Sequence, residues 1–129
     1  MFGGLRQNKA GKVEVCDEVY TLRLANKECN WTKQGEKWGD NGPLSRSQHT
    51  AVAFTDKLWV FGGHFTPQVR LNDVWIYDTK NNSWFQPPWQ DKITPTNNKT
   101  TGGGPCPRAN SAAVIYGNKV YLFGGHGGY

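Results

Sequence analysis

The chain has 129 residues, which is at most one ordinary domain. Six Trp, five Tyr and six Phe accompany 16 Gly, a mixture that favours strands and turns over helices. The net charge is +5, but only 19% of residues are charged and the Lys and Arg are scattered. This pattern lacks the basic stripe of a nucleic-acid-binding protein, and no apolar stretch approaches the length of a membrane span. We therefore expect neither a nucleic-acid nor a membrane partner.

The first segment opens with MFGGL, an aromatic residue followed by Gly3 and Gly4. Residues 16–32 (CDEVYTLRLANKECNWT) then combine an acidic stretch, Val and an aromatic residue, a polar turn, and Trp31. Alternating aromatic and aliphatic residues around a polar turn predict two antiparallel strands. The three cysteines, Cys16, Cys29 and Cys106, follow no zinc spacing and are odd in number, which is typical of a reduced, cytoplasmic compartment.

The middle segment predicts a four-stranded antiparallel sheet. Residues 49–54 and 58–61 flank the turn TDK, and residues 74–77 and 83–86 flank DTKNNS. No stretch has a convincing period of 3.6 residues, so no helix is expected.

The last segment repeats the middle one. Residues 104–125 (GPCPRANSAAVIYGNKVYLFGG) align without a gap on residues 42–63 (GPLSRSQHTAVAFTDKLWVFGG), and strands are expected at 111–115 and 120–123 around YGNK. The three double glycines lie 59 and 62 residues apart. An internal repeat of this period is typical of a propeller or a solenoid.

These features resemble the kelch repeat, in which a strand ends in a double glycine and an acidic stretch precedes an aromatic-bearing strand and a Trp. The resemblance covers the whole chain and implies an all-β fold: four-stranded antiparallel kelch blades of a β-propeller. Its glycines would take positive φ where blades crowd the axis, and its Trp and Tyr would fill the space between blades. The expected divisions are the end of one blade (1–41), a complete blade plus linker (42–103) and the start of the next (104–129).

Two blades' worth of strands are too few for a closed propeller, which has roughly four to eight blades. Two apolar blade faces left in water would forfeit on the order of 10 kcal/mol, comparable to the stability of a whole domain. We therefore expect a segment of a larger kelch protein, with a ring formed by several copies as the alternative. The remaining blades or further copies of the chain are then expected partners.

The excess length of the repeats predicts a binding side. In an up-and-down sheet, the connections after the second and fourth strands leave on one side, here called the long-loop side. They comprise residues 5–15, 64–71 and those from 126, together with 33–45 and 85–107. The other side, here called the turn side, is expected to hold turns of only a few residues. Long connections on a rigid scaffold are where binding usually resides.

Nine residues are candidates for contacting a protein or peptide partner there. In kelch proteins that bind peptides, contacts often come from the motif Arg or Ser before the first strand and from residues after the double glycine. The resemblance transfers this role to Arg46, Ser47, Gln48, Arg108, Asn110, His64, Phe65 and His126. The arginines could bind an acidic or phosphorylated segment bidentately. The alternative is that each ties loops to neighbouring backbone carbonyls.

Trp89 is the ninth candidate, because Pro87 and Pro88 stiffen the chain before it and could present its ring to solvent. It could instead fold over its own blade. His64 and His126 hold equivalent positions and could join a metal site, or simply hydrogen-bond to the backbone as loop histidines. We expect no metal and no cofactor.

The sequence contains no Ser/His/Asp arrangement, no carboxylates paired at catalytic spacing and no phosphate-binding loop. The leading hypothesis is a non-catalytic protein–protein interaction module that acts in the cytoplasm, including cytoskeletal or ciliary locations. The alternatives are a metal-dependent kelch-type propeller enzyme and a structural scaffold component of a cytoskeletal or ciliary assembly.

Overall fold

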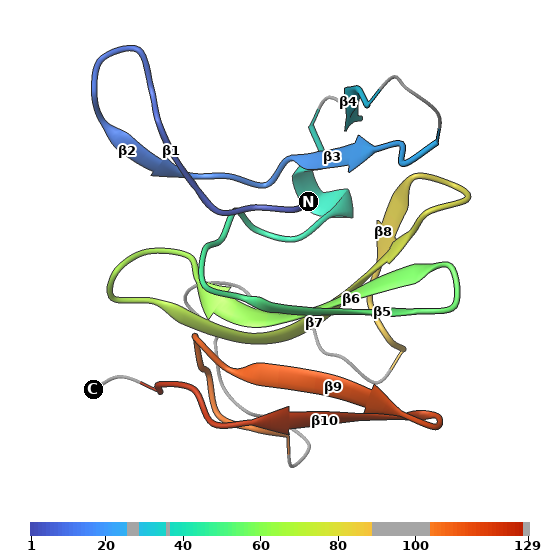
Figure 1. Cartoon of the computed structure of the whole chain (residues 1–129). Coiled ribbons are helices and arrows are strands. Elements are labelled where there is room, and N and C mark those ends of the chain that lie inside the picture. Colours follow the sequence, from blue (N-terminus) through green and yellow to red (C-terminus); the bar gives the residue numbers. More distant parts are fainter. Residues whose placement is uncertain (26–28, 36, 89–103, 128–129) are drawn as a thin grey trace.

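The computed structural model describes residues 1–25, 29–35, 37–88 and 104–127. In these ranges the elements are ten β-strands and one short 3₁₀-helix, η1 (Gly39–Asn41), which confirms the all-β prediction. Figure 1 shows the strands as antiparallel sheets stacked on one another, with the N-terminal strands above and the C-terminal strands below the longest sheet. No helix in the described part of the chain is long and apolar enough to cross a membrane.

The central sheet has four antiparallel strands in the order β5-β6-β7-β8, as predicted. The strands are β5 (Thr50–Phe54), β6 (Lys57–His64), β7 (Arg70–Asp78) and β8 (Ser83–Phe85). Strand β6 continues past its predicted end, because a register shift between Phe61 and Gly63 lets Gly63 and His64 keep pairing with β7.

Three two-stranded sheets complete the described part of the chain. The N-terminal sheet pairs β3 (Val19–Leu22) with β4 (Trp31–Gln34), and the C-terminal sheet pairs β9 (Ala112–Tyr116) with β10 (Lys119–Phe123). An isolated bridge joins Phe2 to Val19, just as Phe61 pairs with Val74 in the central sheet. The third sheet is a hairpin of β1 (Leu5–Gln7) and β2 (Val13–Val15), formed within the long connection 5–15.

The main hydrophobic core lies between the N-terminal and central sheets. Val60, Tyr77 and Trp84 from the central sheet pack against Phe2 and Val19, and all five side chains are buried. The ring of Trp84 lies 4.8 Å from that of Phe2 and 5.0 Å from that of Tyr77, between centroids. Aromatic side chains therefore fill the space between neighbouring sheets, as the resemblance predicted.

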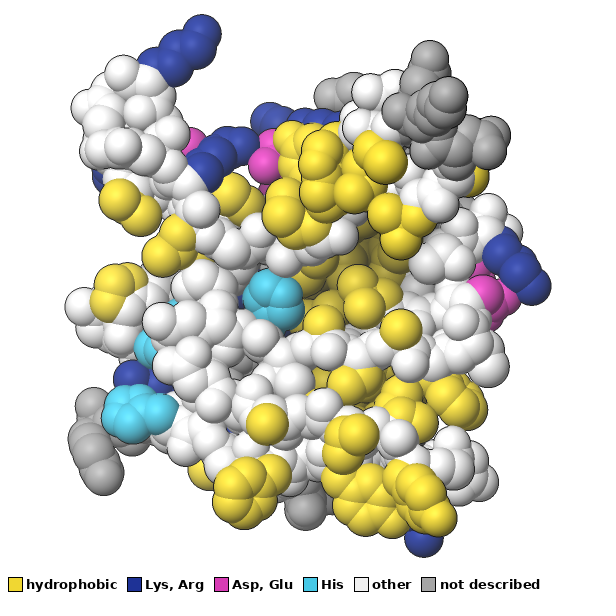
Figure 2. All heavy atoms as spheres, viewed as in Figure 1, with side chains coloured by type: hydrophobic (Ala, Val, Ile, Leu, Met, Phe, Trp, Pro, Cys, Tyr) yellow, Lys and Arg dark blue, Asp and Glu magenta, His cyan; other side chains and the backbone are white. Residues whose placement is uncertain are grey.

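The opposite face of the central sheet packs on the C-terminal sheet through β5 and β9. The Thr50 hydroxyl donates a 2.6 Å hydrogen bond to the carbonyl of Ser111, which fixes the two inner strands to each other. The outermost faces remain open, with Met1 and Trp31 exposed at one end and Tyr121 and Phe123 at the other. Figure 2 shows hydrophobic side chains gathered over β9 and β10 at the bottom of the view.

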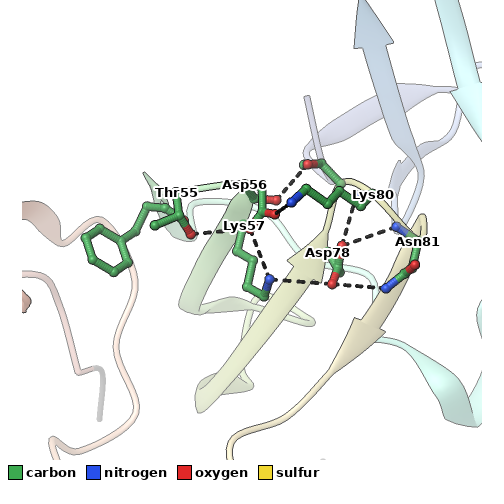
Figure 3. A network of polar contacts seen from close by, with 8 residues as sticks. Thr55, Asp56, Lys57, Asp78, Lys80 and Asn81 are labelled. Atoms are coloured by element: carbon green, nitrogen blue, oxygen red, sulfur yellow. Dashed lines mark hydrogen bonds and ion pairs between the residues drawn. The ribbon is translucent and has the colours of Figure 1, made fainter.

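The turn side is closed by a charge network that ties the β5–β6 turn to the β7–β8 turn (Figure 3). Lys57 lies 3.0 Å from a carboxylate oxygen of Asp56 and 3.5 Å from one of Asp78, while Lys80 lies 2.7 Å from Asp56. The hydrogen bond from Lys80, followed by that from Lys57, holds the pKa of Asp56 well below its usual range. These four charges satisfy one another, so this edge is a weak candidate for recognising a charged partner.

The connections are divided between the two sides less simply than expected. The β5–β6 and β9–β10 turns are short, but residues 23–30 join β3 to β4 on the turn side, where only a few residues were predicted. The expectation that all excess length falls on the long-loop side is therefore wrong for this connection, of which residues 26–28 are outside the described ranges.

Candidate functional site

The long-loop side is built on a regular set of backbone contacts. Ser47 and His64 exchange hydrogen bonds of 3.0 and 2.8 Å, and Ala109 and His126 exchange equivalent bonds of 3.2 and 2.8 Å. In each repeat the residues before the first strand therefore lie beside those after the double glycine. The structure therefore brings together the positions around the motif arginine and the positions after the double glycine, from which the candidates were drawn.

Arg46 is fully buried, with 0% exposure, and its guanidinium binds the carboxylate of Asp73 through two nitrogen atoms. The two N–O distances are 2.5 and 2.8 Å, and the same side chain donates to the carbonyls of Gly62 and Leu44. This is a correction to its candidacy as a partner-binding residue, because a buried and fully paired guanidinium has no surface to offer. The structural alternative holds for Arg46, and its neighbour Ser47 is buried as well.

Arg108 holds the equivalent position in the next repeat and makes the equivalent backbone contacts. Its Nη1 donates to the carbonyl of Gly124 (2.7 Å) and its Nε to that of Cys106 (3.2 Å). Its Nη2 contacts the Cys106 sulfur at 3.2 Å, in the place where Arg46 meets a carboxylate. The side chain is half-buried.

Gln48 and Asn110 form an exposed amide pair at equivalent positions of adjacent repeats. The Asn110 Nδ2 group donates to the Gln48 side-chain oxygen at 3.3 Å, and the Asn110 backbone N–H donates to the Gln48 carbonyl at 2.9 Å. Both residues adopt positive φ, 54° and 57°, a conformation that is unusual for glutamine and better tolerated by asparagine. Two exposed amide side chains that lie side by side in this conformation are a candidate contact point.

The two histidines on this side are held by different partners. His64 is half-buried, and its Nδ1 lies 3.3 Å from the carbonyl of Thr66, to which only an N–H can donate. His126 is exposed, and its Nδ1 accepts from Arg70 at 3.0 Å. Within the described ranges, no group of three or more His, Cys, Asp or Glu side chains could hold a metal ion. Arg70 was missed by the sequence analysis because it lies at the start of β7, outside the repeated motif.

The remaining candidates contribute less to the site. Phe65 is half-buried and lies in a turn, where its backbone N–H donates a 2.9 Å hydrogen bond to the Val69 carbonyl. Trp89 lies outside the described residues.

His49 lies under this side, and its imidazole contacts the Phe2 ring at a centroid distance of 5.2 Å. Within the described structure its Nδ1 has no hydrogen-bond partner. Burial, aided by the positive charge of Arg46, lowers the pKa of His49 to about 4 from an ordinary value of 6.5. The folded chain therefore keeps this imidazole neutral at pH values where the unfolded chain protonates it.

This shift predicts a loss of stability in mild acid. Because the pKa of His49 is lower in the folded chain than in the unfolded chain, the unfolded chain takes up the proton first as the pH falls. The stability is therefore fully present above pH 6.5 and is lost as the pH falls from there through 4. Between pH 7.5 and 5.0 we expect the free energy of unfolding to fall by about 1–2 kcal/mol, discounted for partial exposure. Urea unfolding at both pH values measures it. His49→Gln should remove most of this difference, and an unchanged difference would contradict the assignment to His49.

Comparisons with known proteins agree with this geometry. The family described as "KLHDC2/KLHL20/DRC7 Kelch-repeats domain" matches residues 1–129. The solved structure of YjhT matches 84% of this chain and 27% of its own chain, with a TM-score of 0.61 and 26% identity.

Curated relatives are much longer than this chain. The flagellar outer-arm dynein alpha chain of Chlamydomonas reinhardtii is 33% identical over 99% of this chain, which spans 2% of that protein. Human Kelch domain-containing protein 3 is 31% identical over 97% of this chain and 30% of its own length. Dynein regulatory complex subunit 7 of Chlamydomonas reinhardtii is 29% identical over 98% of this chain and 10% of its own length. The full-length family match and the double-glycine geometry together show that the chain belongs to the kelch-repeat family, with sheets that are blades of a β-propeller left incomplete in this chain.

Proposed function

We propose that the chain is a non-catalytic protein-interaction module whose long-loop side recognises a protein or peptide segment. The observation that carries this proposal is the exposed pair of Gln48 and Asn110, both at positive φ and at equivalent positions of adjacent blades. Each amide offers both a donor and an acceptor, which suits the peptide groups and polar side chains of an extended segment.

The neighbouring residues favour an acidic or phosphorylated segment. His126 is exposed and pairs with Ala109, the residue before Asn110. A nitrogen of the Arg70 guanidinium lies 3.0 Å from its Nδ1. The guanidinium of Arg108 adds a positive charge to this side, whereas the charge of Arg46 is neutralised by Asp73. Phosphate and carboxylate groups match the planar donor arrangement of arginine.

The names of two relatives support a setting for this interaction. One is a flagellar outer-arm dynein chain and another is a subunit of a dynein regulatory complex. We propose that the chain likewise acts in a ciliary or cytoskeletal assembly, where its blades serve as a scaffold for a protein partner.

Substitution by glycine separates binding from folding at this site. Glycine adopts positive φ without strain, so Gln48→Gly and Asn110→Gly remove the exposed amides while leaving the free energy of unfolding unchanged or raising it by up to about 1 kcal/mol. We expect the double variant to lose partner binding by tenfold or more, as judged by quantitative co-precipitation from ciliated cells and by chemical denaturation of the purified chain.

The matched control is Lys119→Ala, an exposed substitution beside the β9–β10 turn on the turn side. It should recover the same partners as the unmodified chain. Equal recovery by all three proteins, with stability intact, would place the binding surface elsewhere.

A further inference from the structure

The hairpin of β1 and β2 exposes two aliphatic side chains on one of its faces. It projects from the long-loop side beside the N-terminal sheet, at the upper left of Figure 1. Leu5 pairs with Val15 and Gln7 pairs with Val13, so these four side chains share one face, here called the open hairpin face. Leu5 and Val13 are 61% and 60% exposed. They lie diagonally across the two strands, close enough to contact one apolar side chain together.

Ion pairs occupy the opposite face of the hairpin. Arg6 lies 2.9 Å from its cross-strand neighbour Glu14 and 2.9 Å from Glu18, between nitrogen and oxygen atoms. The two carboxylate side chains are 38% and 19% exposed, so they are better covered than the aliphatic side chains of the open hairpin face. Glu14 is the only acidic residue in the connection 5–15, and the β6–β7 connection 65–69 contains none. The charge of Arg6 is therefore neutralised locally.

The open hairpin face is turned toward the central sheet. Val19 packs into the core between the N-terminal and central sheets, whereas Lys33 pairs with the residue after Val19 and so lies on the other face of its sheet. Lys33 lies 3.4 Å from Glu18, which places the ion pairs on the side away from the central sheet. Figure 2 shows hydrophobic side chains along the lower side of the hairpin, above the β6–β7 connection. The open hairpin face thus lies over the complete central blade, between two connections that are both described.

The tip of the hairpin adds two positive charges to this face. The Asn8 side-chain oxygen accepts hydrogen bonds of 3.0 Å from the N–H groups of Ala10 and Lys12, and the Asn8 N–H donates to the Lys12 carbonyl at 2.9 Å. These bonds fix the backbone of the tip before any partner arrives. Lys9 and Lys12 are exposed, and neither forms an ion pair with a residue in the described ranges. An apolar surface therefore ends in two available cations.

We propose that the open hairpin face, with Lys9 and Lys12, binds a segment of a protein partner in which an apolar side chain is flanked by carboxylates. The apolar side chain covers Leu5 and Val13, and the carboxylates pair with the two lysines. Because Lys12 directly precedes Val13, the nearest carboxylate lies within about three residues of the apolar side chain in an extended segment. This proposal rests on the function proposed above and specifies what the long-loop side recognises.

A protein segment suits this surface better than a membrane does. Each lysine near an anionic bilayer contributes only about 1 kcal/mol, and two lysines with two aliphatic side chains are too few for lasting attachment. The cations and the aliphatic side chains instead lie within a few residues of one another, which matches the spacing of side chains along one extended segment.

The test begins with a phage library of random heptapeptides, selected on the immobilised 129-residue chain. We expect enriched sequences to combine a Leu, Ile, Val or Phe with neighbouring Asp or Glu. One enriched peptide is then titrated into the chain by calorimetry, together with a copy in which every carboxylate is replaced by an amide. The amide copy should bind at least about fivefold more weakly, because two exposed ion pairs are lost.

Substitutions in the hairpin assign the two contributions separately. Leu5→Thr with Val13→Thr keeps residues that favour strands and should weaken both peptides by about tenfold. Lys9→Gln with Lys12→Gln should weaken the acidic peptide by the same factor as the amide replacement and leave binding of the amide copy unchanged, since both changes remove one interaction.

The matched controls lie on the turn side. Leu24→Thr changes an aliphatic side chain that is also exposed, and Lys119→Gln removes an exposed positive charge. Neither should alter binding of either peptide.

The outcomes separate this inference from the proposed function. Peptides that bind the hairpin variants as well as the unmodified chain, but are lost with Gln48→Gly and Asn110→Gly, would overturn the inference and leave the proposed function standing. Enriched peptides without carboxylates would also overturn it. Selection of no peptide at all would contradict both. Self-association of the chain, or binding to phosphatidylserine vesicles, that is lost in the hairpin variants would overturn the choice of occupant.

Discussion

Replacing Arg46 with alanine is expected to lower the free energy of unfolding of the chain by about 3–5 kcal/mol, measured by urea denaturation at pH 7.5. The substitution leaves the carboxylate of Asp73 buried at 2% exposure without its counter-charge. It also removes the donor to the Gly62 carbonyl, which lies at the start of the bulge in β6. Trp75 keeps its 3.0 Å hydrogen bond to Asp73, but one neutral donor cannot offset a desolvated charge.

The repeat supplies a matched control at Arg108. Arg108→Ala removes the same backbone hydrogen bonds from a half-buried side chain that has no carboxylate partner in the described residues, so we expect a loss of about 1 kcal/mol. The double replacement Arg46→Met with Asp73→Leu should be less destabilising than Arg46→Ala alone, because no unpaired charge remains. Equal losses for Arg46→Ala and Arg108→Ala would show that the Asp73 carboxylate is not the cause.

The strands could be predicted because their signals are local. Alternating apolar residues around short polar turns located the β5–β6, β7–β8 and β9–β10 hairpins to within a few residues. The end of β6 could not be found in this way, since Gly62 and Gly63 are poor strand formers when considered alone. They stay in the strand because β7 pairs with residues on both sides of the bulge, which depends on a partner several residues further along the chain.

The site was harder to predict because burial and backbone conformation decide which candidates are available. The sequence analysis left two roles open for Arg46, and the choice depends on Asp73, which is 27 residues away. The recurring acidic residue before Val74 was the available signal. The positive φ of Gln48 and Asn110 had no such signal, because glutamine in particular rarely adopts it.

Equivalent sequence positions also differ in environment, which the alignment of the repeats cannot show. Arg46 and Arg108 share the motif, but among the described residues only the guanidinium of Arg46 meets a carboxylate, that of Asp73 in β7. The double glycines also share a conformation but not an environment. They have positive φ in all three repeats, while the atoms nearest to them differ from repeat to repeat. The alignment therefore predicts conformation well and predicts contacts only where the neighbouring blade is the same.

Gly62→Ala and Gly124→Ala test this distinction between conformation and contact. Both glycines have positive φ, 56° and 70°, so either alanine should destabilise the chain by about 1–2 kcal/mol through its backbone alone. A Cβ at Gly62 would also lie 2.6 Å from the Arg108 carbonyl oxygen and 2.8 Å from that of Leu71, whereas a Cβ at Gly124 meets nothing within 4 Å among the described residues. The Leu71 carbonyl belongs to β7 and accepts a 3.0 Å hydrogen bond from the Arg108 N–H, which joins the central sheet to the segment before β9. Because backbone must move to relieve the clash, we expect Gly62→Ala to lose about 3–5 kcal/mol in total by urea denaturation. Equal losses at the two positions would show that glycine is required there because of positive φ alone. The close approach of neighbouring backbone would then not contribute.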